Sequence, residues 1–160
     1  MRHKVYASDK DQAGRDKRMS NRINITRREF QDSYRRHYKM YRETTGNDKS
    51  RRLLLFYSVE CGLKSLLMKE LGNNTYDEFV ECCGSENKKL TGHNISAMLK
   101  RLNPHNSYCL RNIHLKRGGF APPEKFNELW RYGAALEDVN EEEKAEKTLA
   151  KIAEWIHTKL

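Results

Sequence analysis

The sequence predicts an all-α protein, a bundle of four to five helices that follows a basic N-terminal arm. Apolar side chains recur at spacings of three and four residues in several separate segments, and no segment keeps the alternating pattern of a β-strand. Capping residues and glycines mark where these segments begin and end. Hydrophobic residues make up 37% of the 160 residues, which is enough for one modest core if they are concentrated in the helices.

The charge of the chain is concentrated near its N-terminus. Residues 1–22 contain almost nothing to bury, which predicts a flexible basic arm in front of a single helical domain over 23–160. The formal net charge is +9; residues 1–52 hold 16 Lys or Arg and 7 Asp or Glu, whereas residues 53–160 hold 15 of each. This asymmetry favours a polyanionic partner, and the alternative is a tail that only increases solubility.

The first helix is predicted to run from Thr26 to about Glu43, because Thr26 and Glu29 fit a capping box and Gly46 follows the end. Its apolar face combines residues spaced by four, three and four: Phe30, Tyr34, His37 and Tyr41. The opposite side carries cations that we expect to be exposed and to contact nucleic acid: Arg28, Arg35, Lys39 and Arg42.

The second helix is predicted over about residues 49–71 and is apolar on almost every face. Such a helix is central to a bundle or lies between subunits, and we expect it, together with the last predicted helix over residues 140–160, to hold a homodimer. Glu60 shares a face with several leucines, where a lone carboxylate is costly to bury. Lys64, four residues later, favours an internal ion pair; alternatively, Glu60 orients His93 or Arg131.

The remaining helices are shorter or lie near the C-terminus. Thr75 and Glu78 form a second capping-box pattern before a short helix that ends by residue 84. His93 and Asn94 precede another helix, where we expect them to cap exposed backbone N–H groups. Pro104 ends that helix, and two more are predicted over residues 123–136 and 140–160.

A further set of cations and histidines lies in and just before the long connection 103–122. Its members are Arg101, His105, Arg111, His114, Lys116 and Arg117. In RNA cleavage, His105 or His114 would remove the 2′-OH proton, and Arg101 or Arg111 would stabilise charge at phosphorus. The alternatives are phosphate binding, for which we select Arg111, Lys116 and Arg117, and a solvated loop with neither role.

The cysteines favour a reduced interior without disulfides. A zinc site would have to combine Cys82, Cys83, His105 and Cys109, whose spacings match no closed tetrahedral site. We therefore expect neither a metal nor a cofactor.

Three short segments resemble the HEPN superfamily: Tyr-Ser-Val-Glu-Cys-Gly-Leu-Lys-Ser-Leu-Leu at 57–67, Gly-His-Asn-Ile at 92–95 and Arg-Tyr-Gly at 131–133. The likeness covers roughly residues 50–160 and implies a small helical bundle that often dimerises. Many members are metal-independent endoribonucleases of prokaryotic defence and toxin–antitoxin systems, and others are inactive binding modules. Active members carry an Arg, four to six residues and then a His, and no Arg in this chain has a His at that distance.

These features together predict a HEPN-like protein that binds RNA or another nucleic acid as a non-catalytic or accessory module in prokaryotic defence or a toxin–antitoxin system. One alternative is a divergent, metal-independent HEPN endoribonuclease. Another is a protein–protein adaptor whose basic helix docks on an acidic partner. The longest apolar run covers only residues 53–57 and no apolar segment follows the charged N-terminus, so we expect a cytoplasmic protein with no membrane contact. A protein partner from the same system is a further expectation.

Overall fold

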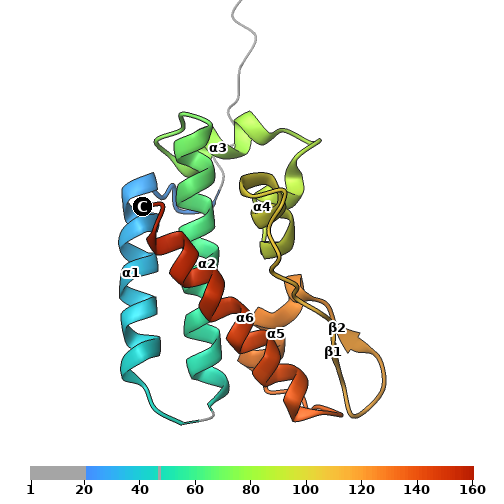
Figure 1. Ribbon diagram of the computed structural model, residues 1–160. Helices are drawn as coiled ribbons and strands as arrows, with labels where there is room; N and C mark the ends of the chain where they lie inside the picture. Colours follow the sequence, from blue (N-terminus) through green and yellow to red (C-terminus); the bar gives the residue numbers. More distant parts are fainter. Residues whose placement is uncertain (1–20, 47) are drawn as a thin grey trace, which may run out of the picture.

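The computed structural model describes residues 21–46 and 48–160, and this part of the chain is an all-α bundle with one very short β-hairpin (Figure 1). Its α-helices are α1 (Arg27–Glu43), α2 (Lys49–Glu70), α3 (Tyr76–Cys83), α4 (Ile95–Leu102), α5 (Phe126–Tyr132) and α6 (Val139–His157). Two 3-10 turns, η1 (Lys88–Leu90) and η2 (Pro123–Lys125), and two strands, β1 (Ile113–His114) and β2 (Phe120–Ala121), complete the described elements. The predicted all-α class is confirmed, and the described residues form six α-helices, which is more than the four to five predicted.

The most apolar helix, α2, lies at the centre of the bundle. It packs along α1 and also contacts α4, α5 and α6, and thirteen of its 22 residues are buried. Gly62 allows two neighbours to come close, because a Cβ at this position would lie 2.7 Å from Ile156 Cγ2 and 2.9 Å from Tyr34 Cδ2. The chain itself therefore covers most of the apolar surface of α2, and the predicted homodimer stays a prediction.

Side-chain caps begin the helices where the sequence places them. Thr26 and Glu29 form a capping box at the start of α1, and Thr75 and Glu78 form one at the start of α3. The two starts are joined, since Thr26 and Thr75 form an antiparallel bridge. Of the predicted arm, 1–22, residues 1–20 lie outside the described residues.

A buried ionic network, which the sequence did not indicate, joins α2 to α6. Arg52 is only 2% exposed and contacts Glu142 at 3.0 Å and Glu146 at 2.7 Å. Trp130 Nε1 donates to Glu142 at 2.9 Å, and the Tyr41 hydroxyl donates to Glu146 at 2.9 Å. The ion pairs between α2 and α6, with one further donor each from α1 and α5, thus satisfy the charges that the core buries.

The structure differs from the sequence-based expectation in two places. The connection 103–122 contains the β1–β2 hairpin, in which His114 pairs with Phe120. Two-residue strands are too short to produce an alternating pattern. The helix predicted over residues 123–136 ends at Tyr132, because Gly133 adopts a left-handed conformation at φ 67°. Among the described helices, none has the length and apolar character needed to cross a membrane.

Candidate nucleic-acid interface

The outer side of α1 carries the predicted cations. Tyr34 and Tyr41 are buried, and all four selected cations are exposed: Arg28, Arg35, Lys39 and Arg42. The helical spacing therefore separates the buried aromatic face from the cationic face as expected.

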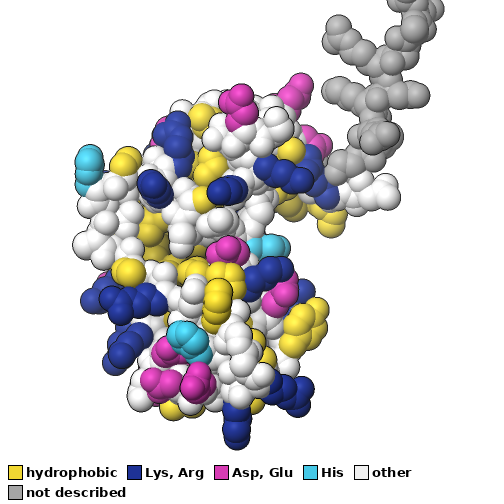
Figure 2. Space-filling view, turned by 90° about the vertical axis from the view of Figure 1, so that its right-hand side faces the viewer, with side chains coloured by type: hydrophobic (Ala, Val, Ile, Leu, Met, Phe, Trp, Pro, Cys, Tyr) yellow, Lys and Arg dark blue, Asp and Glu magenta, His cyan; other side chains and the backbone are white. Residues whose placement is uncertain are grey.

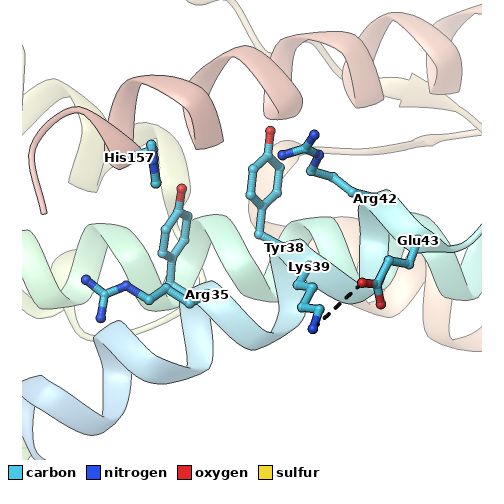
Figure 3. Close-up of a pocket in the computed structure, with 7 residues that line it drawn as sticks. Arg35, Tyr38, Lys39, Arg42, Glu43 and His157 are labelled. Atoms are coloured by element: carbon cyan, nitrogen blue, oxygen red, sulfur yellow. Dashed lines mark ion pairs between the residues drawn. The ribbon is translucent and has the colours of Figure 1, made fainter.

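Three of these cations line a cavity of about 430 Å³ between α1 and the C-terminal part of α6 (Figure 3). Its walls are formed by Tyr34, Arg35, Tyr38, Lys39, Arg42, Glu43 and His157. Figure 3 shows Tyr38 rising from α1 towards α6 with Arg42 beside it, while His157 approaches from α6. We call the space that these seven residues line the α1 cavity.

Tyr38 is the aromatic residue of this cavity that remains partly exposed. Its ring stacks on Tyr34 at a centroid distance of 5.9 Å and on Tyr41 at 6.2 Å. The Arg42 guanidinium lies 5.9 Å from the Tyr38 centroid. Burial and the nearby Glu154 raise the pKa of Tyr38, so the phenol is neutral at neutral pH. A neutral aromatic edge with a cation beside it suits contact with both a base and a phosphate.

The acidic residues near the α1 cations form only weak ion pairs with them. Arg35 lies 3.7 Å from Asp32 and Lys39 lies 3.8 Å from Glu43, and all four side chains are more than half exposed. Exposed pairs at such distances are weak. Both cations therefore remain available to an anionic ligand.

The other predicted phosphate-binding residues lie on the opposite side of the molecule. Arg111, Lys116 and Arg117 are exposed on and around the β1–β2 hairpin, which Figure 1 shows far from α1. On the face that includes the hairpin, Figure 2 shows Lys and Arg in separate groups with acidic and hydrophobic side chains between them. The two predicted sets of cations therefore do not form one surface.

Only two of the four proposed catalytic residues come together. His114 and Arg111 line one cavity of about 500 Å³, whereas Arg101 pairs with Glu70 and His105 is exposed beyond α4. His114 Nδ1 lies 2.9 Å from Glu141 Oε1. This hydrogen bond and the charge of Glu141 raise the pKa of His114, and the His114 backbone N–H helps to lower the pKa of Glu141.

The polar residues of the short motifs form a second, partly buried cluster. Glu60 Oε1 accepts from Lys64 Nζ at 2.7 Å, and Glu60 Oε2 lies 2.8 Å from His93 Nδ1. Glu60 thus makes both the internal ion pair and the contact with His93 that the sequence suggested. Burial raises the pKa of Glu60, but His93 and Lys64 together outweigh it, and the pKa lies below its ordinary value.

Two further motif residues have separate structural roles. The Asn94 side chain accepts from the Ala97 N–H at 2.9 Å and caps α4. Arg131 donates to the Tyr57 hydroxyl, so its hydrogen-bond partner is on α2 but is not Glu60. Both residues therefore position elements of the fold.

The four cysteines do not form a metal site. All are free thiols; Cys82 and Cys109 are exposed, whereas Cys83 is buried. In residues 21–46 and 48–160, no group of three or more His, Cys, Asp or Glu side chains is placed to hold a metal ion. The zinc alternative is therefore not supported.

The fold and surface define a small all-α bundle with a cationic, partly aromatic helix face. Sequence reasoning missed Tyr38 and His157 in that face. Tyr38 had a signal, since it lies four residues after Tyr34 and four before Arg42. His157 had no such signal in the sequence, since only the path of α6 brings it to α1.

Comparison with protein-family models, with curated proteins and with solved structures found no match to this chain.

Proposed function

We propose that this chain is a HEPN-like helical protein that binds RNA or another nucleic acid through the outer side of α1. The observation that carries the proposal is the α1 cavity, whose lining combines Arg35, Lys39 and Arg42 with the partly exposed Tyr38 ring, Arg42 lying beside that ring (Figure 3). The cations would contact phosphates, and the ring would contact a base. Arg28 extends the cationic face by about two helical turns beyond Arg35.

The same geometry favours single-stranded over duplex nucleic acid. A base reaches an aromatic ring only when it is free of its own stack, as in single strands and loops. The cavity of about 430 Å³ is large enough to admit one such group. Single-stranded RNA is therefore the ligand of choice for the first binding measurement.

The adaptor alternative uses the same cations but has no role for Tyr38. An acidic peptide needs opposing charge only, and a ring that projects between cations adds nothing that a carboxylate recognises. The stacked arrangement of Tyr34, Tyr38 and Tyr41 thus favours the nucleic-acid proposal.

The assignment to a non-catalytic HEPN-like module belongs to the same proposal. Two contacts between the motif segments support it, because Glu60 meets His93 and Arg131 meets Tyr57. The missing Arg–His spacing supports a binding role without cleavage. The defence or toxin–antitoxin context, the homodimer and the cytoplasmic location come from the sequence alone and stay predictions.

The salt dependence of RNA binding tests the proposal. We would measure fluorescence anisotropy of a labelled single-stranded RNA with the full chain at increasing salt concentrations. Each phosphate contact with a single strand contributes about −0.7 to the slope of log affinity against log salt concentration, so four contacts predict a slope of about −3. An adaptor would show no RNA affinity at the lowest salt concentration, and that result would contradict the proposal.

A further inference from the structure

A second cavity, of about 500 Å³, lies between the hairpin and the N-terminal half of α6 and plays no part in the α1 interface. Three of its lining residues carry or can acquire positive charge: Arg111 before β1, His114 in β1 and Lys144 in α6. Glu141 is the acidic group that lines it. We call this the hairpin cavity.

Glu141 fixes the position of His114. One carboxylate oxygen accepts the backbone N–H of His114 at 2.7 Å, and the other lies 2.9 Å from the ring Nδ1. Nδ1 is thereby engaged and Nε2 is left for a ligand. Glu141 and Glu137 favour the protonated form of this imidazole, and Arg111 and Lys144 line the same cavity. With the imidazole protonated, the lining carries three positive charges against one carboxylate.

An exposed aromatic ring stands beside this imidazole. Phe120 is the cross-strand partner of His114, and the two ring centroids lie 6.4 Å apart in an edge-to-face arrangement. Phe120 is 55% exposed, so it contributes little to the core. Nearby, Lys116 and Arg117 precede the glycine turn that joins the strands. A ring among cations at an exposed hairpin offers a stacking surface next to a cationic cavity.

We infer that the hairpin cavity binds the terminal phosphate monoester of an RNA strand, with His114, Arg111 and Lys144 around the phosphate and the terminal base on Phe120. This inference rests on the proposed RNA binding and adds a specificity for one end of the strand.

Two physical arguments favour a terminal phosphate over an internal one. A phosphate monoester carries about −1.5 to −2 charges at pH 7, compared with a single charge on a diester, and it offers three acceptor oxygens. Three cationic groups in one recess match that higher charge. A terminal phosphate can also enter a closed recess, whereas an internal phosphate needs room for the strand to continue on both sides.

The length of α6 relates the two sites. Its residues rise 1.5 Å each, so Glu141 in the hairpin cavity and His157 in the α1 cavity are separated by about 24 Å along the axis. At about 3.4 Å per stacked nucleotide, this distance corresponds to a minimum of roughly seven nucleotides, because a strand that joins sites on opposite sides must also pass around the bundle. The test therefore uses strands longer than about ten nucleotides, so that the end and the body of one strand are long enough to reach both sites.

The experiment compares RNAs of identical sequence that end in hydroxyl groups, in a 5′-phosphate or in a 3′-phosphate. In anisotropy titrations, at least one phosphorylated form should bind about tenfold more tightly than the hydroxyl form. H114Q and K144Q should each abolish this gain, whereas K100Q, which removes an exposed lysine from α4, should keep it. F120A should reduce the gain and F120L should not restore it. The gain should also fall as the pH rises through the pKa of His114.

Equal affinity for all three RNAs would overturn the inference while leaving the proposed function intact. A gain that persists in both H114Q and K144Q would overturn it as well. If no RNA binds, the proposed function fails, and phosphate binding in the hairpin cavity is then tested separately by NMR. Adenosine monophosphate and inorganic phosphate should each shift the His114 imidazole signals, and the absence of any shift contradicts a phosphate site.

Discussion

The guanidinium of Arg42 lies 5.9 Å from the centroid of the Tyr38 ring, one turn earlier on the same helix. This pair places a positive charge and an aromatic surface side by side at the edge of the α1 cavity. Each nucleotide of a nucleic acid offers the complementary pair: a phosphate for the cation and a base for the ring. The relationship between Arg42 and Tyr38 therefore distinguishes this face from a helix that is merely basic.

Tyr38 should contribute to RNA affinity through its ring. Y38A removes the stacking surface and should weaken binding by about 1–3 kcal/mol, the range measured for base–aromatic stacking. Y38F keeps the ring and should bind within about twofold of the parent, which is close to no change in free energy. The measurement is anisotropy with single-stranded RNA, and an unchanged affinity in Y38A would show that no base stacks there.

RNA should remain intact in the presence of the protein. Of the four candidate catalytic residues, only His114 and Arg111 share a cavity, and the HEPN Arg–His spacing is missing. We expect labelled RNA incubated with the protein in EDTA to keep its full length on a denaturing gel. Cleavage that H114A abolishes would instead support the metal-independent ribonuclease.

The close packing at Gly62 should make G62A destabilising. The new Cβ would overlap Ile156 and Tyr34, and overpacking of this kind costs about 1–3 kcal/mol. G92A provides the matched control, because a Cβ at Gly92 meets nothing within 4 Å. Urea unfolding followed by circular dichroism measures both variants; equal stabilities would show that the three helices can move apart at no cost.

The buried Glu60 should make stability depend on pH in the acid range. Its pKa in the folded state lies below the ordinary value of 4.5, because the contacts with His93 and Lys64 outweigh the effect of burial. Such a group stabilises the fold above its unfolded pKa, and the contribution is lost as the pH falls below 4.5 through the folded pKa.

The variant E60Q isolates this contribution. It cannot ionise, so its free energy of unfolding should fall less than that of the parent between neutral pH and pH below 4.5. At neutral pH it should be less stable by about 3–5 kcal/mol, because Lys64 is then buried without a counter-charge. Parallel stability curves for the two proteins would show that Glu60 has the same pKa in both states.

Local signals in the sequence predicted much of the fold. Thr26, Thr75 and Asn94 each accept a backbone N–H at the start of the expected helix. These caps depend on residues three positions away, and such spacing is visible in one sequence. The exposed cations of α1 were predictable for the same reason, since one helical period fixes their side.

Contacts between distant residues were not predictable in this way. Arg52 meets Glu146 across 94 positions, and His114 meets Glu141 across 27. His157 reaches the α1 cavity only because α6 runs obliquely across the bundle (Figure 1). Pairing partners at these separations depends on the packing of whole helices, about which charge and periodicity say nothing.

We expect RNA to bind a localised face of α1 and not to be held by the overall positive charge. The most direct measurement compares two variants with the same change in net charge. One reverses the α1 cavity cations (R35E, K39E and R42E), and the other reverses three exposed lysines elsewhere (K69E, K89E and K100E). Circular dichroism should show that both remain folded. The first variant should lose RNA binding in anisotropy titrations while the second keeps it, and equal affinities for the two variants would show that α1 is not the binding face.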